Sequence, residues 1–147
     1  MEERNPSEPS AAGKPLPHCN AFLLCEEVTE NNVTGAVCLM NLVEVVLLSE
    51  FPGSWGPFVL FLQLYDGIGR YGVRVELHDL TDDRVAKAGF YEVDFPNRLD
   101  KMDLAIPIEA MRLPRPGRYK WVVYLNDEEL AMQYFDAEAE NGKEEKG

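Results

Sequence analysis

The chain has 147 residues, 46% of them hydrophobic and 10% aromatic, so it is long and apolar enough to bury the core of one globular domain. Its 14 Lys and Arg face 26 Asp and Glu, and the net charge of −12 disfavours nucleic acid and anionic membranes as partners, because both are bound through basic side chains. No stretch approaches the roughly 18 uninterrupted apolar residues of a membrane span.

The N-terminal stretch "MEERNPSEPSAAGKPLP" predicts a cytoplasmic protein, because it has acidic residues and prolines where a signal peptide needs a basic start and an apolar run. Residues 1–17 and the acidic residues 137–147 are expected to be disordered tails, since they carry few large apolar side chains. The region between them, residues 18–136, is predicted to be a single domain.

The first expected strand is "CNAFLLCEEV", residues 19–28. Cys19 and Cys25 are six residues apart on it, roughly 20 Å, which is beyond disulfide reach. Alternation puts Cys19, Ala21, Leu23 and Cys25 on one face, so the two thiols are expected to be inert core groups. The turn "TENN" follows.

The second expected strand is "VTGAVCLMNLVEVVLL", residues 33–48, bent at Gly35. Its run of Leu, Met and Val also fits a buried helix, but the valines favour a strand. Two alternatives stay open: a short helix within residues 36–57, or a long loop there that includes "SEFPGSWG".

Residues 57–65 and 70–80 alternate between apolar and polar positions and read as two strands. The motif G-x-G-x-x-G, which has the spacing of a dinucleotide-binding loop, starts between these strands and ends in the second one. Its glycines are Gly67, Gly69 and Gly72. Such a loop opens a helix that faces the phosphates, whereas the residues after Gly72 alternate as a strand. We therefore expect a hairpin and no phosphate site.

The remaining expected strands are "RVAKAGFYEVDF", "MDLAIPIEAM", "RYKWVVYLND" and "EELAMQYFDA". Pro107 cannot donate a backbone hydrogen bond, which predicts that its strand lies at a sheet edge. Tyr119 follows Pro116 and Gly117 at a strand start, where it is either a tyrosine corner, with its hydroxyl bonded to the upstream loop, or an ordinary tyrosine at the core edge.

About eight short strands without a helix long enough for a crossover predict an all-β fold, an antiparallel β-sandwich of immunoglobulin-like or C2-like architecture. The sequence also resembles a family of small bacterial β-sandwich proteins catalogued as a domain of unknown function. The segments that carry this resemblance are "AFLLCEEV", "VTGAV", "SEFPGSWGPFVLFLQL" and "LPRPGRYKWVVYLNDEELA", within residues 18–136. The resemblance implies the fold and a bacterial origin, and it supplies no catalytic residues.

No group of residues forms a catalytic motif, so we expect a protein that is not an enzyme. Ser54 in "GSWG" does not match the G-x-S-x-G turn of hydrolases. His78 has a local partner in Glu76 on the same strand face, a spacing that suits an exposed polar stripe. The three cysteines and two histidines lack the short paired spacing of zinc sites, and no cofactor is expected.

The acidic turns suggest one candidate ligand, calcium, which takes six to eight oxygen ligands. If successive strands traverse the sandwich, alternate loops meet at one end, and the residues gathered there are Glu30, Asp66, Asp94, Asp100, Asp103 and Asp127. The favoured ligands in this set are Asp66, Asp94, Asp100 and Asp103. The simpler interpretation is that acidic residues favour solvated turns. At the other end, ordinary surface pairing is expected between Asp79, Asp82 and Asp83 and the arginines Arg112, Arg115 and Arg118.

Several strands are apolar on both faces, although the outer face of a sandwich sheet is normally polar. Such strands need a second cover, which is either the 36–57 segment or a partner. The predicted interaction surface consists of Val59, Phe61, Tyr65, Val122 and Tyr124. We therefore expect a non-enzymatic interaction or structural module that binds a protein partner or a second copy of itself, with a calcium- or small-ligand-binding module as the alternative.

Overall fold

The computed structural model describes residues 15–97 and 101–140, and within them the chain forms eleven strands. They are β1 (His18–Glu30), β2 (Val37–Leu42), β3 (Val45–Leu48), β4 (Gly53–Trp55), β5 (Phe58–Tyr65), β6 (Gly69–Asp79), β7 (Arg84–Phe95), β8 (Lys101–Ile108), β9 (Met111–Leu113), β10 (Gly117–Leu125) and β11 (Glu128–Ala139).

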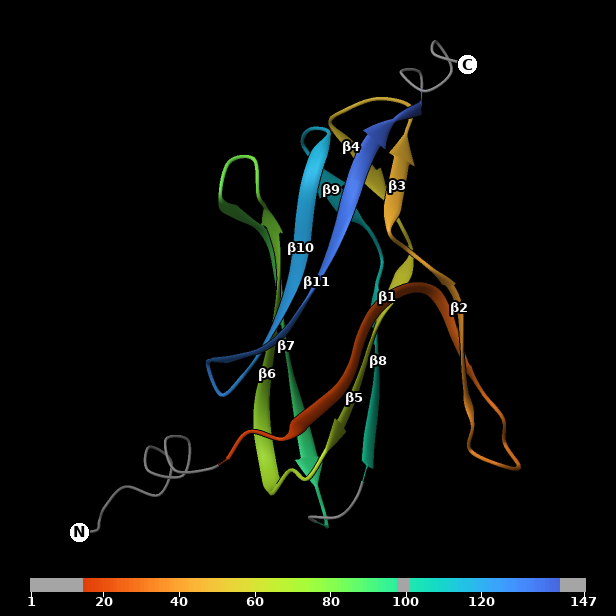
Figure 1. The fold of residues 1–147 in the computed structure, drawn as a ribbon, viewed down its shortest axis with the longest axis vertical. Helices are drawn as coiled ribbons and strands as arrows, with labels where there is room; N and C mark the ends of the chain where they lie inside the picture. The colour runs from red at the N-terminus through yellow and green to blue at the C-terminus, as the bar shows by residue number, and fades with distance from the viewer. Residues whose placement is uncertain (1–14, 98–100, 141–147) are drawn as a thin grey trace, which may run out of the picture.

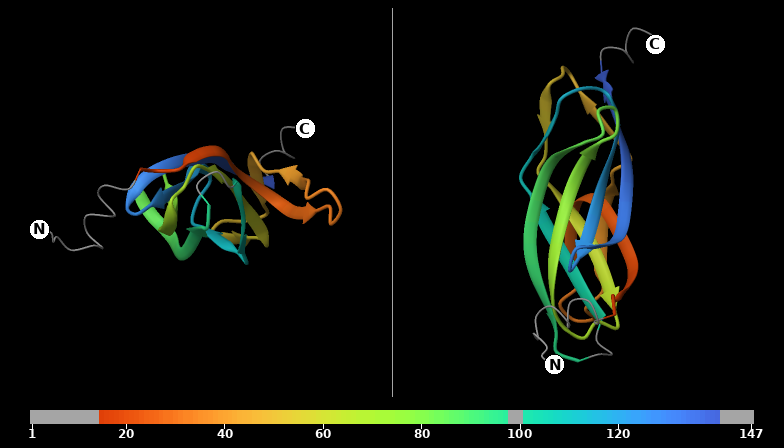
Figure 2. Two further views of the ribbon diagram at one scale, coloured as in Figure 1. Left: turned by 90° about the horizontal axis from the view of Figure 1, so that it is seen from below. Right: turned by 90° about the vertical axis from the view of Figure 1, so that its left-hand side faces the viewer.

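The strands form two main sheets, with the orders β2-β1-β5-β8 and β3-β11-β10-β6-β7, and a small third sheet, β4-β9 (Figure 1). In the right-hand view of Figure 2 the strands run roughly along the long axis of the molecule. The all-β sandwich is confirmed. The strand count exceeds the expected eight because β3, β4 and β9 are too short for the periodicity of the sequence to reveal, and β3 pairs with β11 in parallel.

The core lies between the two sheets and is built by strict alternation. On β5, Leu60, Leu62 and Leu64 point inward and are fully buried. They belong to one cluster with Leu77 of β6 and Trp121 of β10. Each large apolar side chain buried in this way contributes about 1.5–3 kcal/mol relative to leaving it in water.

The segment 36–48 is strand, so the helix alternative is wrong. It forms β2 in one sheet and β3 in the other, and the chain crosses between the sheets at Val43 and Glu44. Asn41 has a φ of 61°, which no helix accommodates. The predicted loop after it also contains a strand, β4.

The predicted hairpin over residues 57–80 is wrong, although both of its strands exist. β5 and β6 lie in different sheets, so residues 66–68 carry the chain over the end of the sandwich. Asp66 (φ 65°) and Gly69 (φ 72°) turn the backbone, and a Cβ at Gly67 would stand 2.3 Å from the ring of Phe95. Gly67 and Gly69 therefore allow the chain to reverse its direction where it packs against the ring of Phe95. Gly72 lies within β6, which confirms that no helix follows the glycine motif.

The structure decides between the two alternatives for Tyr119 and confirms the prediction for Pro107. The hydroxyl of Tyr119 donates to the carbonyl of Arg115 at 2.6 Å, the hydrogen bond of a tyrosine corner. Pro107 lies in β8, which is an edge strand.

The ordered body extends slightly beyond residues 18–136. At one end Leu16 packs against the core and Tyr71 donates to the carbonyl of Pro15 at 2.9 Å. At the other end β11 continues to Ala139. The rest of the predicted tails, residues 1–14 and 141–147, lies outside the described residues. Among those described, no helix has the length and apolar character needed to cross a membrane.

Candidate functional site

The five residues of the predicted interaction surface lie on two opposite faces of the sandwich. Val59, Phe61 and Tyr65 alternate with the core leucines of β5, so they face outward from the four-stranded sheet. Val122 and Tyr124 alternate with Trp121 and Val123 of β10 and face outward from the five-stranded sheet. The structure therefore does not join them in one surface.

Phe61 and Val122 are also covered by their own chain. Phe61 is 4% exposed and Val122 is 1% exposed, although both stand outside the core cluster. Leu23 and Ala105 flank Phe61 in the neighbouring strands, and Val122 pairs with Glu76 and Met132. Neighbours in the same sheet thus flank both residues.

The centre of the outer face of the five-stranded sheet is a polar network. Arg74 donates to Glu76 at 2.9 Å, and its guanidinium carbon lies 4.2 Å from the centre of the Tyr124 ring. His78 Nε2 lies 2.9 Å from Glu76, which confirms the predicted local pairing, and Arg74 also pairs with Asp127. Burial alone would raise the pKa of Glu76, but the hydrogen bonds from His78 and Arg74 outweigh burial and lower it. This face is therefore less apolar than the sequence suggests.

The largest exposed apolar side chain on this sheet stands at its edge, on β7. Phe90 is 73% exposed, and Val85 and Tyr91 of the same strand are exposed as well. Sequence reasoning identified β7 as a strand but did not single out these residues, because their exposure follows from the position of β7 as the last strand of its sheet. The two adjacent aromatic residues, Phe90 and Tyr91, were the available signal.

A second exposed apolar group lies on the opposite side of the molecule, along β2 and β3 (Figure 1). Its members are Met40, Leu42, Val45 and Leu47. This is the segment whose apolar character was noted in the sequence. It is irregular, because the chain changes sheets in its middle.

Two cavities flank β7, one on each face, and each lies beside a glycine. On the outer face, a hollow of 340 Å³ lies around Gly72 and is bordered by Phe90, Glu92 and Arg74. We call it the outer hollow. On the inner face, a cavity of 240 Å³ lies beside Gly89.

The inner cavity lies at the open seam between the two sheets, so we call it the seam cavity. It is lined by Val75, Ala88, Gly89 and Tyr91 of β6 and β7, by Pro107 and Ile108 of β8, and by Glu109 and Trp121. Trp121 is fully buried, and its indole N–H finds no acceptor among the described residues. A buried donor without a partner is unfavourable, so an acceptor placed next to this N–H would be stabilising.

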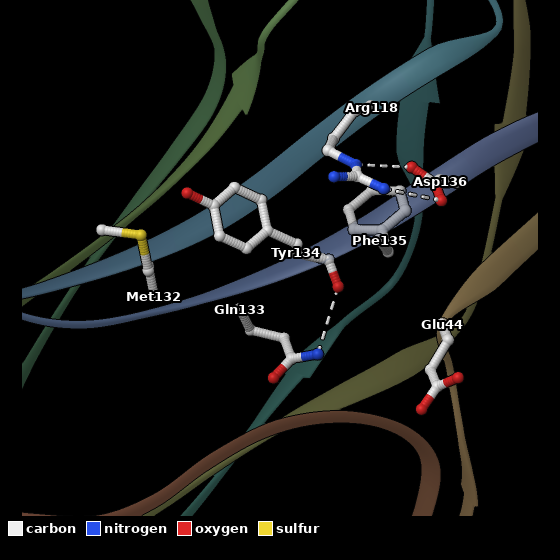
Figure 3. A pocket seen from close by; sticks show the side chains of 7 residues that line it. All are labelled: Glu44, Arg118, Met132, Gln133, Tyr134, Phe135 and Asp136. Atoms are coloured by element: carbon white, nitrogen blue, oxygen red, sulfur yellow. Dashed lines mark hydrogen bonds and ion pairs between the residues drawn. The ribbon is translucent and has the colours of Figure 1, made fainter.

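A third cavity, of 390 Å³, lies along β11 and is drawn in Figure 3. Arg118 and Asp136 form an ion pair on its wall at 2.9 Å, and the hydrogen bond from Arg118 lowers the pKa of Asp136. In the view of Figure 3, the ring of Tyr134 lies between this pair and Met132. Arg118 and Asp136 satisfy each other, so neither of these two charges is left to select a ligand.

The candidate calcium ligands that the structure describes are not grouped as a metal site. Within residues 15–97 and 101–140, no three or more His, Cys, Asp or Glu side chains are grouped so as to hold a metal ion. Asp103 accepts from Gln63 and Lys101, and Asp94 pairs in register with Arg70. Asp66 occupies the turn between β5 and β6. Asp100 lies outside the described residues.

At the other end, Arg115 bridges two carboxylates. It lies 2.8 Å from Asp82 and 3.6 Å from Asp79. The expected surface pairing is wrong for Asp79, which is 1% exposed and accepts from the backbone N–H of Thr81 at 3.0 Å. Arg118 pairs with Asp136 instead, as described above.

The three thiols differ in their surroundings. A register shift between Cys19 and Ala21 separates the two cysteines of β1, so Cys19 packs against the core while Cys25 is buried outside the core cluster. The expectation that both share a core-facing side is therefore wrong. Burial raises the pKa of both Cys19 and Cys25, whereas Cys38 is exposed.

With the fold and these surfaces in place, comparison with known proteins assigns the family. Residues 20–136 match the model of a family of unknown function, DUF6941. The chain belongs to this family. No curated protein matches the chain.

Comparison with solved structures finds similarity at low sequence identity. The chain is similar to the alkylpurine DNA glycosylase AlkC of Pseudomonas fluorescens, bound to DNA with an abasic site analogue, with 16% identity and a TM-score of 0.51 over 84% of this chain and 30% of that one. A β-glucosidase of Listeria innocua gives 14% identity and a TM-score of 0.44 over 80% of this chain and 16% of that one. The CARDB domain of a Pyrococcus furiosus protein, in complex with di-metal ions, gives 12% identity and a TM-score of 0.39 over 86% of this chain and 90% of that one.

The chain thus spans under a third of the length of the first two of these proteins. At such identities the likeness to the glycosylase concerns the fold alone.

Proposed function

We propose that this protein is a non-enzymatic binding module that holds a protein partner on the side of the sandwich where β7 lies. The observation that carries the proposal is the 73% exposure of Phe90 on an edge strand. Large aromatic side chains at the surface are the usual anchors of protein interfaces, because they bury much apolar area at little conformational cost.

The surroundings of Phe90 support an interface in this place. Val85 stands on the same strand, and the outer hollow lies directly beside Phe90. An apolar anchor with a polar rim is the usual arrangement of a protein–protein contact. Arg74, Glu76 and Glu92 supply that rim.

The test is capture of a partner from a lysate of the source organism with three versions of the protein. Phe90→Glu places a charge on the proposed anchor, and Leu42→Glu is the matched control, because Leu42 is also an exposed apolar residue on a strand but lies on the opposite side. We expect wild type and Leu42→Glu to retain the same partner and Phe90→Glu to lose it by more than about tenfold in affinity.

A partner that Phe90→Glu keeps and Leu42→Glu loses would move the interface to β2 and β3 and contradict the proposal. Recovery of no partner by the wild-type protein would also count against it. The melting temperatures of the three proteins should agree, since both substituted side chains are exposed.

A further inference from the structure

The open edge of β7 is the best-suited place on this molecule for another strand to pair. The other edge strands are shorter or interrupted: β2 has 6 residues, β3 has 4, and β8 contains Pro107. β7 has 12 residues, and no other strand of the described chain pairs with its outer side.

Proteins protect exposed edges with lysines, prolines and bulges, because unpaired N–H and C=O groups invite a further strand. In β7 these devices are confined to the first few residues, where Lys87 occurs and the register with β6 shifts. From Ala88 to Phe95 the strand contains neither lysine nor proline, and its pairing with β6 is regular. This eight-residue stretch is left open to pairing.

The two cavities beside this stretch lie on alternate faces of β7. Gly72, which borders the outer hollow, pairs in register with Glu92, and Gly89, which borders the seam cavity, pairs with Val75. A strand added next to β7 would send successive side chains to these two faces in turn. This is the pattern by which added strands gain specificity: backbone bonds supply affinity, and pockets receive alternate side chains.

The charges around β7 select a basic occupant. Glu92 is exposed on the strand itself and Glu109 borders the seam cavity, whereas Asp94 stands opposite Arg70 in register. The positive charge nearest to the outer hollow, that of Arg74, is already paired with Glu76 and Asp127. A second copy of this chain would bring a further net charge of −12 and the same carboxylates, so it suits this edge less well.

The seam cavity favours an apolar side chain. Its walls include Val75, Ile108 and Trp121, and its 240 Å³ fall below the range of about 300–1,000 Å³ that drug-sized ligands occupy. A single side chain with an apolar body matches this size. An oxygen or sulfur acceptor on that side chain, or the carbonyl next to it, would compensate the unpaired indole N–H of Trp121.

We propose that an extended, basic segment of the partner protein pairs as an additional strand with Ala88–Phe95 of β7, with a Lys or Arg next to Glu92 at the outer hollow and an apolar side chain in the seam cavity. The inference rests on the proposed function and specifies its partner. Phe90 then anchors the outer side of the added strand, and Tyr91, whose ring lies 3.2 Å from where a Cβ of Gly89 would be, borders the entrance of the seam cavity.

The first test needs no native partner, because it uses random peptides of about 12 residues displayed on phage, which is the length of β7 and long enough to span Ala88–Phe95. We expect enriched peptides in which basic residues alternate with apolar ones at a period of two, as strand pairing requires. Enrichment of peptides with a helical period, of acidic peptides, or of none would overturn the inference.

Variants then locate the bound peptide. Gly89→Leu puts a side chain into the seam cavity and should weaken binding at least tenfold, while Glu92→Gln should weaken it less and reduce its dependence on salt. Leu42→Glu is the control and should bind as wild type does. Unchanged binding by Gly89→Leu, with a melting temperature like that of wild type, would overturn the inference.

The fluorescence of Trp121 reports on the seam cavity. The chain has two tryptophans, so a Trp55→Phe variant leaves Trp121 as the single tryptophan, which can be excited selectively at about 295 nm, on the order of 15 nm beyond the absorption maximum of tyrosine. Peptide binding should change its emission, and the amides of Ala88–Phe95 that do not bond to β6 should gain protection from hydrogen exchange. A bound peptide that leaves both unchanged binds elsewhere, and the inference then fails.

The variants distinguish failure of the strand-addition inference from failure of the proposed function. If Phe90→Glu loses the native partner while Gly89→Leu keeps it at full affinity, the surface on β7 is correct and strand addition is wrong. If peptide and partner binding both survive Phe90→Glu, the proposed function is wrong. A concentration-dependent dimer that protects the same amides would replace the basic partner by a second copy and overturn the choice of occupant.

Discussion

At the scale of single residues, exposure and hydrogen bonding separate chemically identical side chains. The three thiols are the clearest example: Cys25 is fully buried, Cys19 packs against the core, and Cys38 lies in the open on β2. Thiol reactivity follows the accessible thiolate, and burial raises the pKa of Cys19 and Cys25.

We therefore predict one fast-reacting thiol per chain. Iodoacetamide at neutral pH should label Cys38 rapidly, Cys19 slowly, and Cys25 only when the protein unfolds. Peptide mass mapping over time distinguishes them, with the fully denatured protein as control. Equal labelling of Cys25 and Cys38 in the folded protein would mean that β1 is not packed as described.

Tyr119 is a second residue whose environment determines how much it contributes to the stability of the fold. Burial raises the pKa of its hydroxyl, which donates to the carbonyl of Arg115. Tyr119→Phe keeps the packed ring but leaves this carbonyl without its donor, so we expect a loss of about 1–3 kcal/mol in the free energy of unfolding. Urea unfolding measures it, and Tyr134→Phe, at an exposed site, should change stability by less than about 0.5 kcal/mol.

At the scale of elements, the sequence predicted most strands from alternation but not their partners. The period-2 pattern of β6 was correctly read because the apolar side chains of that strand are all on its buried face. The connection between β5 and β6 was misread because Asp and Gly also begin hairpins, and only the ring of Phe95 against Gly67, far along the chain, distinguishes the two geometries.

The outer side of β5 illustrates the same limit. Alternation correctly placed Phe61 outside the core, but its burial depends on the neighbours Leu23 and Ala105, which pairing alone brings together. We predict that Phe61→Glu destabilises the fold by about 3 kcal/mol or more, because it buries an unpaired charge. Thermal unfolding tests this, with Phe90→Glu as the exposed control of the same chemistry.

The polar network on β6 should make stability depend on pH. The pKa of Glu76 is lowered in the folded protein, so its contribution is present above its unfolded value of about 4.3 and is lost as the pH falls through the folded pKa. Between about pH 6 and about pH 3, wild type should therefore lose more stability than Glu76→Gln does. Urea titrations at each pH give the difference, and parallel curves for the two proteins would contradict the prediction.

At the scale of the whole molecule, the sandwich and the family follow from the sequence, whereas the candidate site does not. The outward residues of β5 and β10 look like one apolar set in the sequence, yet they belong to opposite faces. Phe90 looks like any aromatic residue of a strand until the sheet order shows that nothing described lies beyond β7. Which strands end a sheet is a property of the complete fold, and no local pattern encodes it.

The parallel pairing of β3 with β11 joins two segments that lie far apart in the sequence. About 80 residues separate the end of β3 from the start of β11, so at roughly 5–20 residues per second β3 waits several seconds for its partner to be synthesised. β11 also lies between β3 and β10, so β3 cannot join the five-stranded sheet before β11 has been made. Through that interval Val46 and Leu48, which are buried in the finished fold, lack their cover in the nascent chain.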